Sequence, residues 1–225
     1  MKRAARLALT AAATGFAMLA HTWITLPDVR VLAASPPEST AFMRLREAQA
    51  GAGARPRRQH RWVSYDRISP HLKRAVTVSE DAAFWQHEGL DFDEIQAAIE
   101  TNWADGALTR GASTITQQLA KNLYLSASRN PYRKVRELFI TRRLEAELSK
   151  RRIFELYLNL IEWGDGIWGA EAAARAYFGI PAADLSPPQA ALLAGAIINP
   201  RVYSPAHPNA RLLRRQEIIL GRMGS

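Results

Sequence analysis

The sequence contains no cysteine among its 225 residues. This absence excludes disulfides, thiolate metal ligands and cysteine nucleophiles. The chain also has no stretch of useful length in which apolar and polar residues alternate as in a β-strand, and no internal repeat or low-complexity tract. Apolar residues make up 48% of the chain, which excludes a mostly disordered protein. We therefore predict one globular, mainly α domain with a short appendage.

Charged side chains are absent from the run between Leu7 and Leu26, apart from the titratable His21. About twenty helical residues span the roughly 30 Å hydrocarbon core of a bilayer. We predict an uncleaved single transmembrane helix at residues 7–26, behind a basic cytoplasmic segment at residues 1–6, with the rest of the chain exported. The alternative is a cleaved signal peptide ending near residues 31–33.

The net charge of +9 favours an anionic partner, which could be nucleic acid, a lipid headgroup surface or a phosphorylated substrate. Export of the domain argues against nucleic acid. Residues 27–61 are rich in Ala, Pro, Arg and Gly, and they predict a juxtamembrane connector with one short helix at 41–50. The folded domain is expected to occupy residues 62–225.

Helices with recognisable ends follow one another through this domain. Ser69 and Pro70 form a good helix start, and Thr114 with Gln117 has the spacing of a capping box. The apolar spacing and breakers place the later helices near residues 91–103, 114–125, 130–148, 152–163, 170–178, 187–198 and 209–223.

An acidic residue, Glu80, interrupts the apolar stripe that begins the domain. Leu72, Val76, Ala83 and Phe84 form this stripe at helical spacing. In the commoner interpretation the carboxylate lies at the edge of the stripe and reaches solvent. In the other, the carboxylate is partly desolvated, has a raised pKa and is suited to general acid or base chemistry.

A second carboxylate, Glu137, shares a predicted helix face with Arg133 and Lys134, and Lys121 and Arg129 lie at the neighbouring helix ends. Such a group is usually an ordinary salt-bridge cluster on a helix surface. Four cations converging on two helix ends would instead form a receptor for a phosphate or pyrophosphate. Both interpretations remain open at this point.

Small polar side chains fill the stretch between the two carboxylates. Gln117, Gln118 and Asn122 supply donors and acceptors for sugar hydroxyls or phosphate oxygens. Capping chemistry and a polar helix face explain Gln117 but leave Ser113, Gln118 and Lys121 without an explanation. His87 has no second histidine at ligand spacing, so we interpret it as a structural hydrogen-bonding residue.

Five blocks of this sequence, in this order, resemble the family 51 peptidoglycan glycosyltransferases in their monofunctional biosynthetic form. The blocks are EDAAFWQHEG, GASTITQQLAKN, RKVRE, RRIFELYLN and GDGIWGAEAAARAYFG. The resemblance covers the chain from about residue 62 onward. Ala82, Ala83 and Phe154 depart from the usual pattern without touching a proposed catalytic role. No Ser-x-x-Lys signature occurs, so no transpeptidase domain is expected.

The resemblance implies a lysozyme-like fold and polymerisation of lipid II into glycan strands. It implies a general base at Glu80 and a second catalytic glutamate at Glu137, which assists departure of undecaprenyl pyrophosphate directly or through a divalent cation. Mg²⁺ is the expected ion, and its ligands stay unknown. The implied substrate-binding residues are Ser113, Gln117, Gln118, Lys121, Asn122, Arg129, Arg133 and Lys134.

The same resemblance places the protein in the cell inner membrane, with its catalytic domain on the periplasmic side. The implied partners are lipid II, the nascent glycan chain, the membrane, and cell-wall transpeptidases and division proteins, with no nucleic acid. Glu155 and Asn159 match family positions that we expect to be structural. The rival hypotheses are a murein hydrolase or lytic transglycosylase, a catalytically silent membrane-anchored scaffold, and lastly a basic nucleic-acid binder.

Overall fold

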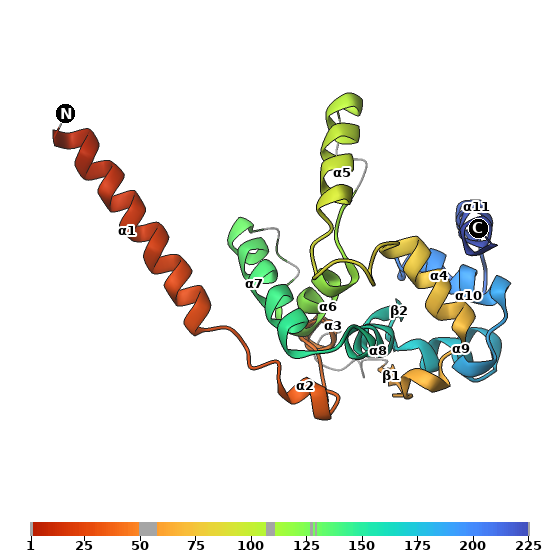
Figure 1. Cartoon of the computed structure of the whole chain (residues 1–225). Coiled ribbons are helices and arrows are strands. Elements are labelled where there is room, and N and C mark those ends of the chain that lie inside the picture. Colours follow the sequence, from red (N-terminus) through yellow and green to blue (C-terminus); the bar gives the residue numbers. More distant parts are fainter. Residues whose placement is uncertain (1, 50–57, 107–110, 127, 129, 225) are drawn as a thin grey trace.

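The computed structural model describes residues 2–49, 58–106, 111–126, 128 and 130–224 (Figure 1). The described residues are mainly helical, which confirms the predicted fold class. The α-helices are α1 (Lys2–Ile24), α2 (Val31–Ala34), α3 (Ala41–Gln49), α4 (Pro70–Glu80), α5 (Phe92–Asp105), α6 (Ile115–Tyr124), α7 (Pro131–Glu147), α8 (Lys150–Leu160), α9 (Ala170–Phe178), α10 (Pro187–Ala196) and α11 (Ala210–Gly224). Two 3₁₀ helices, η1 (Tyr65–Arg67) and η2 (Ala182–Asp184), lie between them.

Three short strands form a small sheet in the order β1-β3-β2, where β1 is Gln59–His60, β2 is Glu162–Gly164 and β3 is Ile167–Trp168. β1 pairs in parallel with β3, and β2 pairs antiparallel to it. The helix predicted at residues 152–163 corresponds to α8, and its predicted C-terminal end was wrong. It stops at Leu160 because the next residues enter β2 and turn at Gly166, whose φ is +72°.

Side-chain caps begin three helices, α4, α6 and α7, that contain residues of the blocks quoted above. Ser69 accepts a hydrogen bond from the His71 N–H, and Asn130 accepts one from the Tyr132 N–H. Thr114 and Gln117 make the predicted capping box at the start of α6. Each such cap contributes about 1 kcal/mol by satisfying N–H groups that the first turn leaves unpaired. These three helix starts were therefore readable from local sequence.

α8 lies at the centre of the hydrophobic core. Seven of its residues, from Ile153 to Leu160, are buried, including Phe154 and Tyr157. Burial of each large apolar side chain contributes about 1.5–3 kcal/mol. Trp163 and Trp168 extend the same core into the sheet. α6 and α7 pack beside α8, so the core fixes the two helices that bear most of the candidate site residues.

The segment that follows α1 also contributes to this core. Leu26, Val29, Leu32 and Met43 are buried in the same cluster as α8, and β1 joins the sheet. The composition of residues 27–61 predicted a connector with one helix, whereas the described part also contains α2 and the buried side chains of Val29, Leu32 and Met43. The body of the molecule therefore begins at the end of α1.

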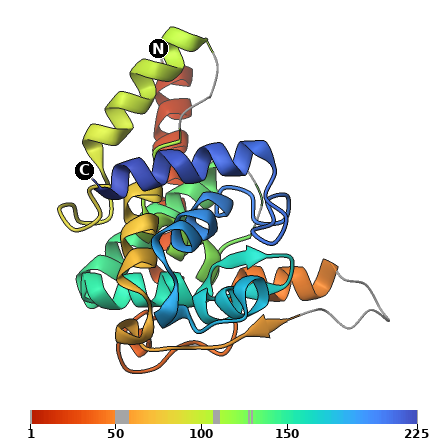
Figure 2. The ribbon, with the colours of Figure 1, turned by 90° about the vertical axis from the view of Figure 1, so that its right-hand side faces the viewer.

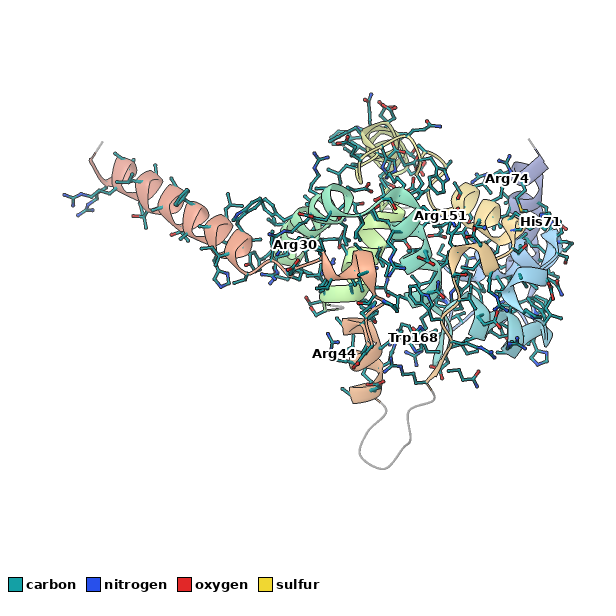
Figure 3. All side chains as sticks on the ribbon, turned by 60° about the horizontal axis from the view of Figure 1, so that its bottom comes forward. Arg30, Arg44, His71, Arg74, Arg151 and Trp168 are labelled. Atoms are coloured by element: carbon teal, nitrogen blue, oxygen red, sulfur yellow. The ribbon has the colours of Figure 1, made fainter. Side chains whose placement is uncertain are left out.

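α1 and α5 project from the same side of the body (Figures 1 and 2). Most of α1 contacts no other element, and Arg30 marks where the chain after it joins the body (Figure 3). Leu7, Phe16 and Ile24 are each more than 70% exposed. Among the described residues, one helix, at Arg3–Ile24, is long and apolar enough to cross a membrane. This finding is compatible with the predicted anchor.

Candidate active site

Glu80 is the last residue of α4. The apolar spacing predicted that this helix continues through Phe84. That prediction was wrong, because Asp81 leaves helical geometry and caps α4 in an extended conformation. One Asp81 carboxylate oxygen accepts a hydrogen bond from the Ile115 N–H at 2.9 Å, and the other pairs with His87. These long-range bonds hold the end of α4 against the start of α6. They place the Glu80 side chain beside Gln118.

Glu80 accepts a hydrogen bond from Gln118 Nε2 at 3.0 Å. Burial raises the pKa of Glu80, and the Gln118 hydrogen bond opposes that rise by stabilising the carboxylate. The buried Tyr157 hydroxyl donates to Gln118 Oε1 at 2.8 Å, which turns the amide N–H₂ toward Glu80. Tyr157 was not among the predicted site residues, and its helical spacing carried no signal of this role.

His87 links the loop after Glu80 to the same network. The Gly89 N–H donates to His87 Nδ1 at 3.0 Å, so this nitrogen carries no proton. His87 Nε2 therefore donates to Asp81 Oδ1, 2.9 Å away. This arrangement confirms the predicted structural role. The ligand atoms of Asp81, His87 and Asp91 lie within 4.8 Å of one another, which is close enough for a metal ion only if the hydrogen bond between Asp81 and His87 were broken.

Glu137 lies on α7 with only 3% of its surface exposed. Arg133 Nη1 donates to one Glu137 oxygen at 2.6 Å, and Lys134 Nζ pairs with the other. Burial lowers the pKa of Lys121, while the charges of Glu137 and Glu80 raise it. The negative charges of both carboxylates therefore act on Lys121. We call Lys121, Arg133 and Lys134 the cation cluster. Arg129 was predicted to join it and lies outside the described residues.

The predicted polar block lies between the two carboxylates on α6. Gln118 contacts Glu80 directly, whereas Gln117 Oε1 accepts the Thr114 N–H at 3.0 Å in the capping box. Asn122 Nδ2 donates to the Gln118 carbonyl oxygen at 2.8 Å. A cavity of about 90 Å³ is lined by Ser113, Gln117, Gln118, Glu137 and the cation cluster. The structure therefore brings every described residue of this prediction except Asn122 to one small cavity.

Two larger cavities flank this one. A cavity of about 670 Å³ is lined by Glu80 and shares Ser113 with the small cavity. Another, of about 210 Å³, shares Gln118 and Lys121 with it and is also lined by Asn122 and Phe42. The site thus has room on both sides of the cation cluster. Glu80 lines the cavity of about 670 Å³, whereas Glu137 and the cation cluster line the cavity of about 90 Å³.

Glu155 and Asn159 have structural roles, as predicted. Glu155 accepts the Tyr65 N–H at 2.8 Å. The Asn159 side-chain amide exchanges two hydrogen bonds with the Val63 backbone, each 3.0 Å long. Both residues fix the chain that leads into α4, and neither lines the three cavities above.

Fold and site together form a helical domain with a desolvated carboxylate on one side of a polar helix and a cation-lined pocket on the other, an arrangement suited to group transfer from an anionic donor. The family model described as Transglycosylase matches residues 46–224. The chain belongs to this transglycosylase family, whose lysozyme-like fold agrees with the helical body described above.

Named relatives cover most of the chain. A biosynthetic peptidoglycan transglycosylase of Laribacter hongkongensis is 54% identical over 83% of this chain and 82% of its own length. The protein of the same name from Nitrosospira multiformis is 52% identical over 84% and 83% of the two chains. That from Chromobacterium violaceum is 55% identical over 73% and 72%.

Proposed function

We propose that this protein is a peptidoglycan glycosyltransferase that polymerises lipid II into glycan strands and releases undecaprenyl pyrophosphate during cell-wall synthesis. Family membership and the names of the relatives support this activity. The observation that carries it is the cation cluster around Glu137, across α6 from Glu80. Glycoside hydrolysis needs no receptor for a pyrophosphate, whereas transfer from a lipid pyrophosphate does.

In this proposal Glu80 is the general base. Its carboxylate takes the proton of the acceptor's 4-hydroxyl group as the oxygen attacks the anomeric carbon of the growing chain. The bond between that carbon and the pyrophosphate oxygen breaks, and its electron pair leaves with the pyrophosphate. Burial raises the pKa of Glu80, which strengthens it as a base near neutral pH. The 670 Å³ cavity beside Glu80 offers room for the acceptor.

The cation cluster stabilises the charge that develops on the leaving pyrophosphate. Glu137 holds Arg133 and Lys134 through its two oxygens, so it acts by fixing these cations in place. The cavity of about 90 Å³ beside these cations is completed by Ser113, Gln117, Gln118 and Lys121. Asn122 and Arg129 belong to the proposed donor-side binding set by resemblance.

A divalent cation, with Mg²⁺ expected, remains part of the family resemblance. Both Glu137 oxygens already face cations, which repel a metal ion. Asp81 and His87 would have to give up their hydrogen bonds to Ile115 and to each other. These residues do not fit a resident ion, and no step is assigned to one. We expect chelation by EDTA to leave the polymerisation rate within about twofold, and a loss restored by Mg²⁺ would contradict this.

We place the protein in the inner membrane, anchored by α1 with the catalytic domain on the periplasmic side. A pyrophosphate-bearing lipid is met at the membrane surface, and the exposed apolar helix supports an anchor there. Lipid II, the nascent glycan, the membrane, and transpeptidases and division proteins are the proposed partners, with no nucleic acid. A reporter fused at each end of the chain tests the topology. A periplasmic N-terminus would contradict it.

Polymerisation of purified lipid II by the full chain tests the function. Wild type is expected to produce long strands that lysozyme digests, and Glu80→Gln none. Glu88→Gln is the matched control, because Glu88 is exposed and follows in the same loop. Cleavage of isolated sacculi without polymer would establish the hydrolase. Full activity of Glu80→Gln would remove Glu80 as the base.

A further inference from the structure

α7 bears functional side chains on two neighbouring sides. One side carries Arg133, Lys134 and Glu137, which line the small cavity. The other carries Tyr132, Arg136 and Phe139, spaced four and three residues apart. Tyr132 and Phe139 contact the last turn of α1, and Arg136 contacts Thr25, the residue that follows it. The two sets interleave along less than three turns of one helix. A displacement of α7 relative to α1 would therefore move Arg133, Lys134 and Glu137 by the same amount.

The contacts to α1 are polar and specific. Tyr132 OH lies 3.0 Å from Thr22 Oγ1 and 3.3 Å from His21 Nδ1, within hydrogen-bond distance of both. Arg136 donates to Thr25 twice, to the hydroxyl at 2.7 Å and to the carbonyl oxygen at 3.1 Å. The second bond satisfies a carbonyl group that follows the end of α1 and has no helical partner.

Phe139 completes this contact on the apolar side. Its ring packs edge-on against Trp23, with centroids 6.1 Å apart. Trp23 remains 62% exposed, as suits an aromatic side chain at the boundary between lipid and water. Thr22, in contrast, is fully buried. The protein therefore covers α1 at its C-terminal end, on the side that faces α7.

The chain after α1 strengthens this attachment. Leu26, Val29 and Leu32 enter the hydrophobic core within eight residues of Ile24, so the end of α1 has little slack. On α7, Arg136 is adjacent to Glu137, and Tyr132 is about 7.5 Å along the helix axis from it. Arg133 and Lys134 are thus fixed within about two helical turns of the point where α1 meets the body.

We propose that Tyr132 and Arg136 are positioning residues that clamp α7 to the end of α1 and so set the height of Arg133 and Lys134, the two members of the cation cluster on α7, above the bilayer surface. This inference rests on the proposed function, since it concerns a pyrophosphate held at headgroup level by its own prenyl chain. A lipid-linked substrate cannot move along the bilayer normal to follow a displaced receptor. A substrate that is free in solution can.

The test compares these two kinds of substrate with the full chain. One is lipid II with its undecaprenyl chain in phospholipid vesicles that hold the reconstituted protein. The other is an analogue with a short, water-dispersible prenyl chain, assayed in detergent. The variant is Tyr132→Phe combined with Arg136→Gln. The control is Arg142→Gln, which changes an exposed arginine on the same helix that contacts Glu88 instead of α1.

We expect the double variant to lose about tenfold or more in kcat/KM on the vesicle-bound substrate, because displacements near 1 Å can cost far more than tenfold in rate. It should stay within about twofold of wild type on the short-chain substrate, and the control should match wild type on both. An equal loss on both substrates would mean that the clamp only supports the fold of α7. No loss on either substrate would mean that these contacts do not set the height of the cations above the bilayer. A wild type that polymerises neither substrate would instead refute the proposed function.

Discussion

The hydrogen bond from Gln118 to Glu80 is expected to set much of the proton affinity of the base. Gln118→Leu keeps a similar side-chain volume and removes the donor that lies 3.0 Å from the carboxylate. A hydrogen bond to a charged group contributes about 1.5–3 kcal/mol. Since about 1.4 kcal/mol is a tenfold change, this range corresponds to roughly 10- to 150-fold in proton affinity. Glu80 is only partly buried, so water replaces part of the bond, and we expect about tenfold.

The sign of the effect follows from the role of the base. Glu80 acts as a base only when deprotonated, so the rate falls as pH drops through its pKa. Burial already raises that pKa, and Gln118 holds it down. Gln118→Leu should therefore move the acidic limb of the kcat/KM profile to higher pH and lower the rate about tenfold at a fixed pH on the limb. Initial polymerisation rates between about pH 5 and pH 9 measure this.

Asn122→Leu is the matched control for this experiment. Asn122 lies one turn further along α6 and donates to the Gln118 carbonyl oxygen, whereas Gln118 itself donates to Glu80. Its loss can weaken substrate binding at every pH without moving the limb. An acidic limb at the same pH in wild type and Gln118→Leu would refute the assignment of Glu80 as the base that Gln118 tunes.

The same variant makes a second, independent prediction about stability. Gln118→Leu leaves the buried Tyr157 hydroxyl without its partner, which costs about 1–3 kcal/mol. Adding Tyr157→Phe removes the unpaired group, so the double variant should unfold at a higher temperature than Gln118→Leu alone. For a chain of this size, 1 kcal/mol corresponds to about 2–4 °C. Purely additive effects of the two substitutions on Tm would contradict the network.

Three further outcomes are expected. Glu80→Gln should unfold at a higher temperature than wild type at pH 8, because the raised folded-state pKa makes the charged form destabilising, and the difference should vanish as pH falls below the ordinary value of 4.5. Lys121→Met should lower the polymerisation rate about 100-fold or more, whereas undiminished sacculus cleavage by this variant would favour a hydrolase, which needs no pyrophosphate receptor. Gly169→Ala should lower Tm more than Gly179→Ala. Both glycines have positive φ, but only at Gly169 would an added Cβ meet a backbone oxygen, that of Asn159 at 2.6 Å. Equal losses of Tm in the two variants would contradict this.

The local signals in the sequence predicted most helix starts. The caps at Ser69, Thr114 and Asn130 act within three residues of themselves, so their effect does not depend on the rest of the fold. The same is true of Arg133 and Glu137, whose spacing alone places them together on a helix. Predictions of this kind were confirmed because each rests on an interaction that the local sequence contains in full.

The end of α4 could not be predicted in that way. Helical spacing continues through Phe84, but Asp81 bonds Ile115, which lies 34 residues later. The placement of Tyr157 against Gln118 joins residues 39 apart. The apolar side chains after α1 likewise reach a core formed by α8, more than a hundred residues away. Composition predicted a connector there, because it carries no information on which residues will pack against each other.

Glu80 and Glu137 show why the pattern of charges alone could not assign their roles. Glu80 has one neutral donor and a partly desolvated carboxylate, so its proton affinity is raised. Glu137 has little exposed surface and a cation on each oxygen, so it holds Arg133 and Lys134 in place. Lys121 lies between them and feels the charges of both. Because three helices supply these surroundings, two identical side chains gain different chemistry only when α4, α6 and α7 come together.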